Sequence, residues 1–269
     1  MTRSRPALVG SIVPEWPVHP RVGALMSTRA GGVSAPPFHA LNLGRASGYD
    51  PDCVRENRRR FEATIGAHPV WLSQVHGVQV VRLDGRGAAP AVEADAAITT
   101  EPGIACTVMV ADCLPVLLAA PDGRGVGAAH AGWRGLAAGV LQATVVALCE
   151  AAACEPQELV AWLGPCIGPR QFEVGADVLA AFGAATAGSL RFVPRPRADG
   201  EMRWLADLPG LARDRLAACG VTTISGGAWC TVEDHSRFFS FRRDRDTGRM
   251  AAAVWLTAGR AGVGTGLGG

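Results

Sequence analysis

The chain has 269 residues, of which 48% are apolar, and its formal net charge is +2. This length can bury a substantial core, and the nearly balanced charge argues against a nucleic-acid-binding surface or an acidic tail. The N-terminal residues lack a signal peptide, and Asp112 and Pro115 interrupt the longest apolar run, residues 103–120. We therefore expect a cytoplasmic protein without a membrane segment, whose eight cysteines are reduced thiols.

Hydrophobic periodicity predicts the elements of the first half. Residues 21–49 are typical of a strand followed by a long shaped loop, 52–65 of a helix, and 70–72 and 78–83 of short strands. The continuous apolar runs 104–110 and 114–120 predict strands that are buried on both faces. Another strand, 126–129, is expected to end at His130.

The second half predicts a helix at 136–153, a strand at 159–163, helices at 178–182 and 205–218, and strands at 222–224 and 250–256. No repeat or linker divides the chain, so we predict a single α/β domain with mixed sheets over residues 1–258. The glycine-rich tail at 259–269 is expected to be mobile. The arginine clusters at 58–60 and 242–245 are interpreted as solvated faces.

Three residues lie in short motifs at predicted strand ends or turns: His76 in S-Q-V-H-G, Cys113 in A-D-C-L-P, and His130 in G-A-A-H-A-G-W-R-G. Two imidazoles and a thiol are ligands that zinc prefers, and three ligands leave a fourth position open for water or substrate. Each residue alone also fits a structural role, such as a hydrogen-bonded histidine or a buried thiol. Asp112, beside Cys113, either orients a histidine ring or forms the turn.

The remaining cysteines that we assign are interpreted as structural: Cys53, Cys149, Cys154 and Cys219 as packing residues of helical segments, Cys106 in a strand and Cys166 in a turn.

Seven motifs carry a resemblance to a known family: T-R-A-G-G-V-S, L-N-L-G, S-Q-V-H-G, A-D-C-L-P-V-L-L, A-A-H-A-G-W-R-G, G-P-C-I-G-P, and the late C-T-V-E-D…F-F-S-F-R-R-D…T-G-R-M. Together, over residues 20–257, they resemble the laccase-domain or multicopper polyphenol oxidase family. That family is also described as purine nucleoside phosphorylases and, in bacteria, as a peptidoglycan editing factor.

The resemblance implies that His76, Cys113 and His130 bind a single zinc ion. It further implies phosphorolysis of adenosine, inosine, guanosine and methylthioadenosine, with adenosine deamination as a second activity. The expected partners are therefore purine nucleosides and phosphate, and the implied fold is a layered α/β/β/α arrangement.

The histidine content argues against laccase-type copper chemistry. The chain has six histidines and no H-x-H pair, and no methionine adjoins the three motifs as an axial copper ligand. One mononuclear site is the most that these residues supply, and zinc is favoured over copper.

Deamination needs a carboxylate that passes protons, and Glu93, Asp95 and Asp112 are the carboxylates nearest the motifs in sequence. Phosphorolysis needs an anion site. The turn at 132–135 offers backbone N–H groups, and Arg29 and Arg242 offer guanidinium groups matched to phosphate oxygens.

We accordingly predict Cys113, Asp112, Arg29 and Arg242 as catalytic residues. Arg134 and Arg243 fit surface charges equally well, and Phe238, Phe239 and Phe241 are assigned to core packing rather than to stacking on a purine.

Three alternatives remain open. Cys113 can act as the nucleophile of a cysteine hydrolase, activated by His76 or His130. The metal can stabilise a protein that is not an enzyme, and a cell-wall editing role is neither supported nor excluded by these residues. We expect a monomer or a small homo-oligomer.

Overall fold

The computed structural model describes residues 8–45, 48–85, 92–183 and 190–258. The first half contains β1 (Val22–Met26), α1 (Pro51–Ile65), β2 (His68–Trp71), β3 (Val80–Leu83), β4 (Ala96–Thr99), β5 (Ile104–Val110), β6 (Leu114–Ala119) and β7 (Val126–Ala131). The second half contains α2 (Trp133–Ala138), α3 (Val140–Ala152), β8 (Val160–Leu163), β9 (Glu173–Val174), α4 (Ala176–Ala181), β10 (Phe192–Pro196), β11 (Met202–Ala206), α5 (Leu208–Ala218), β12 (Thr223–Gly226), α6 (Phe241–Asp244) and β13 (Met250–Leu256).

The strands form two large mixed sheets and a small antiparallel one. The four-stranded sheet has the order β1-β13-β5-β2, in which β2 and β5 are parallel. The six-stranded sheet has the order β12-β8-β6-β7-β4-β3, with parallel pairs at its two ends. The small sheet has the order β10-β11-β9. These sheets confirm the predicted mixed α/β class.

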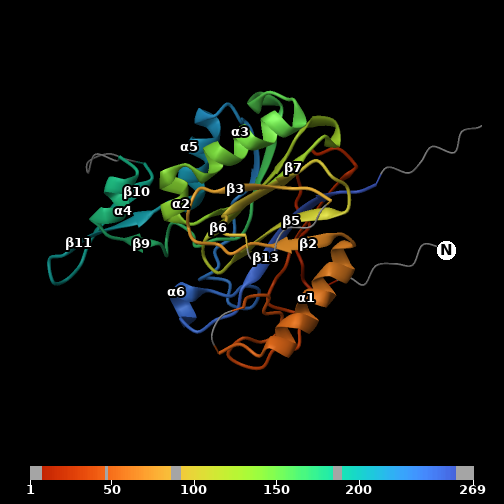
Figure 1. Cartoon of the computed structure of the whole chain (residues 1–269). Helices are drawn as coiled ribbons and strands as arrows, with labels where there is room; N and C mark the ends of the chain where they lie inside the picture. Colours follow the sequence, from red (N-terminus) through yellow and green to blue (C-terminus); the bar gives the residue numbers. More distant parts are fainter. Residues whose placement is uncertain (1–7, 46–47, 86–91, 184–189, 259–269) are drawn as a thin grey trace, which may run out of the picture.

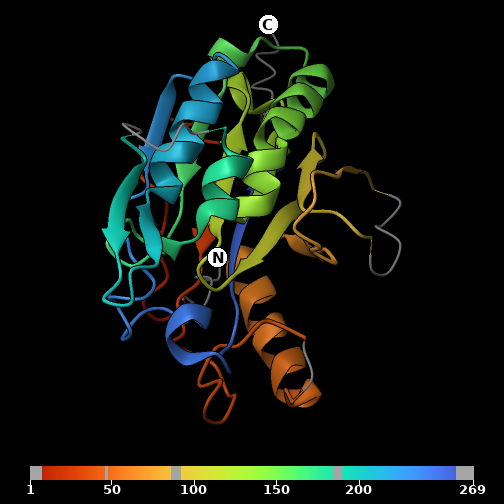
Figure 2. The same cartoon turned by 90° about the vertical axis from the view of Figure 1, so that its left-hand side faces the viewer.

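The layers follow from where the apolar residues are buried. One core cluster lies between the two large sheets, and β5 and β6 are buried on both faces, as their continuous apolar sequences predict. A second cluster joins the six-stranded sheet to α2, α3 and α5, and a third joins the four-stranded sheet to α1. Figures 1 and 2 show α1 on one side of the strands and α3 and α5 on the opposite side. The arrangement is therefore the expected α/β/β/α stack.

Two predicted helices are corrected by the structure. The helix expected at 136–153 is two helices, α2 and α3, because Gly139 between them has a φ of 106° that breaks the helical path. In the helix expected at 205–218, Leu205 and Ala206 belong to β11. The helix starts only after Asp207, whose side chain accepts the N–H of Gly210.

The structure confirms the predicted helix as α1 and corrects one expectation about its arginines. The side chain of Asp50 accepts the N–H groups of Asp52 and Cys53 at the start of the helix, and the left-handed Gly66 ends it. Arg58, however, is buried instead of solvated. Its guanidinium lies 4.0 Å from the Trp71 ring centre, and burial together with the charge of Arg45 lowers its pKa to about 9.

All eight cysteines are free thiols, in agreement with the expectation from sequence. Within the described ranges, no helix has the length and apolar character needed to cross a membrane. The tail at 259–269 lies outside the described residues.

Candidate metal centre and adjoining cavities

Three segments from the two large sheets bring His76, Cys113 and His130 together. His76 lies in the connection from β2 to β3, Cys113 in the connection from β5 to β6, and His130 near the end of β7. Their ligand atoms all lie within 4.8 Å of one another, and His76 Nε2 is 3.8 Å from Cys113 Sγ. In a tetrahedral zinc site the bond lengths separate neighbouring ligand atoms by roughly 3.4–3.6 Å. These three residues, here called the trio, can therefore hold a metal ion with small side-chain shifts.

Asp95 organises two of the three residues. Its fully buried carboxylate accepts the N–H groups of Val75, His76 and Gly77 at 3.1, 2.9 and 2.7 Å. The same carboxylate lies 2.8 Å from His130 Nδ1, which leaves Nε2 of that ring as the nitrogen that can serve as a metal ligand. These contacts also hold His76 in its left-handed conformation, with a φ of 61°. The sequence indicates Asp95 only as one of three possible proton carriers. Its contacts with His130 and with the backbone around His76 become visible only in the folded structure.

The trio is strongly coupled electrostatically. Desolvation by itself raises the pKa of the Cys113 thiol, but the imidazoles of His130 and His76 outweigh it and lower the pKa to about 6. Desolvation likewise acts to lower the pKa of His130, and the Cys113 thiolate and Asp95 instead raise it to about 9. The Cys113 thiolate and the His130 imidazolium therefore stabilise each other. A metal would bind the thiolate and the neutral imidazole, and so would take the place of the imidazolium proton.

Asp112 does not orient a histidine ring. Its carboxylate accepts the hydroxyl of Thr231 at 2.6 Å and the backbone N–H of Arg242 at 2.6 Å. Its own φ is 91°, so it forms the turn that presents Cys113. The turn-forming alternative is therefore the one that the structure supports.

A cavity of about 480 Å³, here called the main cavity, opens beside the trio. None of its lining residues is acidic, and besides the trio itself they include Arg45, Tyr49, Gln74, Phe241 and Arg249. Such a lining provides positive charge and hydrogen-bond donors without a competing carboxylate, which suits an anionic ligand.

Sequence reasoning missed the two arginines of the main cavity and used Gln74 only as part of a motif. Gln74 pairs its amide with the backbone N–H and C=O of Met109 at 2.7 and 2.8 Å, which ties the segment before His76 to β5. Met109 also lines the cavity, so a methionine lies closer to the trio than the motifs indicated. Its sulfur, however, contacts Arg58 Nη2 at 3.5 Å. Arg45 directly follows the L-N-L-G motif, and this was the signal available for it.

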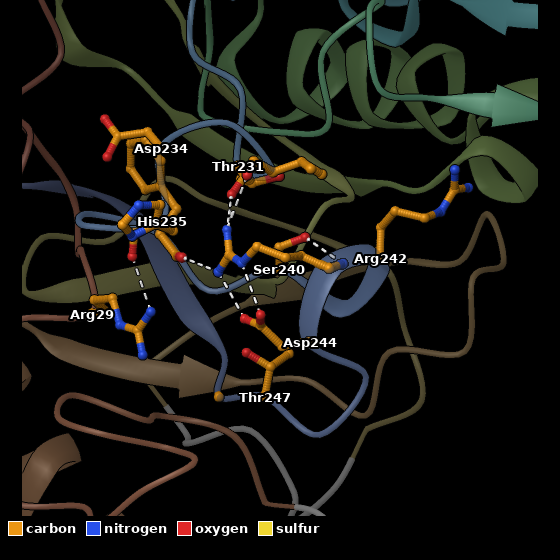
Figure 3. A network of polar contacts seen from close by, with 12 residues as sticks. Arg29, Thr231, Asp234, His235, Ser240, Arg242, Asp244 and Thr247 are labelled. Carbon is orange, nitrogen blue, oxygen red and sulfur yellow. Dashed lines mark hydrogen bonds and ion pairs between the residues drawn. The ribbon is translucent and has the colours of Figure 1, made fainter.

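The predicted phosphate ligand Arg29 lies elsewhere. Its guanidinium donates to the backbone carbonyls of His39 and His235 at distances of 3.0–3.2 Å, and Figure 3 shows the contact with His235. Arg29 lines neither the main cavity nor a smaller cavity that also adjoins Cys113. Glu93, another candidate proton carrier, also lines neither of them.

A smaller cavity of about 130 Å³, here called the side pocket, also adjoins Cys113 and shares Ala111, Cys113 and Phe241 with the main cavity. Its lining consists of Ala111, Asp112, Cys113, Trp133, Ile167, Phe172, Leu208, Phe241 and Arg242. The structure thus brings two of the predicted catalytic residues, Asp112 and Arg242, to the trio at this pocket, whereas Arg29 is not brought there.

The late arginine–phenylalanine motif is largely structural. Phe238 and Phe239 are fully buried, as expected, but Phe241 is 47% exposed and lines both cavities. Arg243 donates to the carbonyls of Thr231, Val232 and Phe238 and pairs with Asp244. In Figure 3 the side chain of Arg242 points away from Thr231, Ser240 and Asp244.

A family model described as "Multi-copper polyphenol oxidoreductase laccase" matches residues 23–257. A protein of Pseudomonas aeruginosa named purine nucleoside phosphorylase is 50% identical over 246 residues, which cover 91% of this chain and 98% of that protein. The purine nucleoside phosphorylase YfiH of Escherichia coli is 50% identical with the same coverage. The crystal structure of a Neisseria meningitidis protein has a TM-score of 0.85 at 41% identity and covers 92% of this chain and 99% of its own.

Proposed function

The chain belongs to the multi-copper polyphenol oxidoreductase laccase family, and we propose that it is a zinc-dependent purine nucleoside phosphorylase that also deaminates adenosine. Its proposed substrates are adenosine, inosine, guanosine and methylthioadenosine, with phosphate. The names of the relatives from Pseudomonas aeruginosa and Escherichia coli support the phosphorylase activity. The observation that carries the proposal is the position of the trio beside a cavity that is lined by two arginines and by no carboxylate.

In this proposal His76, Cys113 and His130 hold the zinc ion. Two imidazoles and a thiolate match the donors that zinc prefers, and the low pKa of the thiol favours the thiolate form that a metal needs. When bound, zinc supplies a Lewis acid that polarises a substrate atom or acidifies a water molecule. The contribution of Asp95 is to hold the His130 ring in one orientation.

A multicopper oxidase activity is not proposed, despite the description of the family model. Within the described part of the chain, the trio is the one group of three or more potential ligands that can hold a metal. The whole sequence has six histidines without an H-x-H pair. A mononuclear site fits these residues better than a copper cluster.

We place the phosphate beside Arg45 and Arg249 in the main cavity. Among the described residues Arg45 has no carboxylate partner, and Arg249 donates to the backbone carbonyls of Thr247 and Gly248. Both guanidinium groups therefore keep donors for phosphate oxygens. Arg29 is less suited because three of its donor contacts are already made to carbonyls. Of the three candidate carboxylates, Asp112 lines the side pocket next to Cys113, and we propose it as the proton carrier.

The decisive experiment incubates zinc-loaded protein with adenosine, with and without phosphate, and separates adenine from inosine. Phosphate-dependent adenine with ribose 1-phosphate is expected from phosphorolysis, and phosphate-independent inosine from deamination. If zinc-loaded protein forms neither product, the proposed function is wrong.

A cysteine hydrolase is the second candidate, since His76 Nε2 lies 3.8 Å from the Cys113 thiol. Metal analysis separates the two functions. About one zinc ion per chain, with protection of Cys113 from alkylation, supports the phosphorylase. A metal-free protein as isolated, with Cys113 readily alkylated, supports the hydrolase.

A further inference from the structure

We propose that the side pocket binds the purine ring, so that the nucleoside spans both cavities with its base in the side pocket and its ribose and phosphate in the main cavity. This inference rests on the proposed function. Its first support is adjacency: Ala111, Cys113 and Phe241 line both cavities, so the two cavities meet beside the candidate metal site.

The walls of the side pocket suit a flat aromatic ring. Trp133, Phe172 and Phe241 contribute three aromatic side chains from α2, from the segment before β9, and from α6. Ile167 and Leu208 add aliphatic surface. Aromatic side chains stack on every base because each base has a π-face, and such stacking is sequence-tolerant. The main cavity, in contrast, brings its positive charge from Arg45 and Arg249, and it suits the ribose and phosphate.

The volumes support the same division. The side pocket, at about 130 Å³, is too small for a whole nucleoside and leaves room only for its flat base. The main cavity, at about 480 Å³, lies within the range of small-molecule sites. The base is therefore assigned to the smaller space, which Cys113 lines, and the remainder of the substrate to the larger one.

Arg242 supplies the polar contact that the pocket needs. Its Nη1 donates to the carbonyls of Gln171 and Glu173, which holds the guanidinium 5.5 Å from the Phe172 ring centre. Both oxygens of Asp112 already accept hydrogen bonds, so the polar groups that the pocket offers a ligand are mainly the hydrogen-bond donors of Arg242. Donors suit the ring nitrogen acceptors that all purines share, and arginine recognises purine edges in this way. The pocket should therefore accept adenine, hypoxanthine and guanine, and bind single-ring pyrimidines more weakly.

The test measures binding of free adenine to the zinc-loaded protein by titration calorimetry, which needs no turnover. Phe241→Ala and Trp133→Leu should each weaken adenine binding about tenfold or more, as loss of base stacking does. Cytosine should bind at least tenfold more weakly than adenine to the unaltered protein. The exposed Val193 of β10, which lines neither cavity, provides the control Val193→Ala, with unchanged adenine binding.

Arg45→Ala should raise the KM for phosphate and leave adenine binding within about twofold of the unaltered protein. Zinc content and melting temperature report whether each variant is folded. Because two aromatic positions are changed separately, the inference is still tested if one of the two variants does not fold. Adenine affinity that is unchanged in both folded aromatic variants, or undetectable in the unaltered protein, overturns the inference. Absence of turnover with adenine binding that depends on Phe241 instead refutes the proposed function and leaves the base pocket standing.

Discussion

A Cβ atom at Gly132 would lie 2.8 Å from His76 Cδ2 and 3.0 Å from Cys113 Sγ, closer than side chains normally pack. Gly132→Ala should therefore push two of the three ligands apart and weaken zinc binding about tenfold or more, within the range seen for changes behind metal ligands. A competition titration with a zinc chelator measures the affinity.

Gly77→Ala is the matched control for this change. Gly77 follows His76 directly, but an added Cβ would meet its nearest neighbours, Asp95 Oδ2 and Val75 Cγ2, at an ordinary 3.5 Å. Its zinc affinity should stay within about twofold of the unaltered protein. Equal losses in both glycine variants would mean that backbone stiffening, and not crowding of the ligands, explains the effect.

The two aspartates beside the trio should differ in the same measurement. Asp95→Asn loses the charge that holds the His130 ring and the N–H groups around His76, so zinc affinity should fall about tenfold to a hundredfold. Asp112→Asn should leave zinc affinity nearly unchanged because its carboxylate contacts Thr231 and Arg242 instead of a ligand. A larger loss for Asp112→Asn than for Asp95→Asn would contradict the assignment of the positioning residue.

At this scale the sequence indicates the three candidate ligands more readily than the residues that position them. His76, Cys113 and His130 could be named because metal-binding side chains are few and lie in recognisable motifs. The contacts of Asp95, and the approach of Arg45 and Arg249 to the cavity, depend on segments far apart in the chain. Only the folded arrangement of the two sheets brings them to one place.

Among the elements, α1 orders the loop that leads to the main cavity. The fully buried Asn57 accepts the N–H of Val33 and donates to Ser34 Oγ and to the carbonyls of Ala40 and Asn42. Asn57→Ala leaves several buried groups without partners, and the free energy of unfolding should fall by about 2–3 kcal/mol. Urea denaturation measures this change.

Arg55→Ala, on the exposed face of the same helix, is the comparison. Its ion pair with Asp52 has side chains that are 73% and 77% exposed, so stability should change by less than about 0.5 kcal/mol. If Asn57→Ala were as harmless as Arg55→Ala, the loop would be held by other contacts.

The elements also show how much of the secondary structure local sequence patterns can predict. Strands β5, β6 and β13 were predicted nearly residue for residue because continuous apolar runs are typical of strands buried on both faces. The break at Gly139 and the change from β11 to α5 at Asp207 were missed, since each depends on one residue within an otherwise regular apolar pattern. The short α6, which presents Phe241 to both cavities, has too few residues for any period to be seen.

At the scale of the whole molecule, the trio joins the two large sheets. His76 and Cys113 lie on connections that run from the four-stranded to the six-stranded sheet, and His130 lies within the six-stranded sheet. A zinc ion bound there would link both layers, and a ligand that binds only the folded state stabilises it by mass action.

Removal of the metal should therefore lower the stability of the entire chain and not only its activity. At free zinc about 100 times its Kd, the stabilisation is about 2.7 kcal/mol, so a chelator should lower the melting temperature by roughly 5–10 °C. Calorimetry with and without chelator measures the shift, and restored zinc should reverse it. His76→Asn removes one ligand while tolerating the left-handed backbone, so its melting temperature should not respond to chelator. A melting temperature of the unaltered, zinc-loaded protein that is insensitive to metal removal would show that the three side chains do not link the sheets through a metal ion.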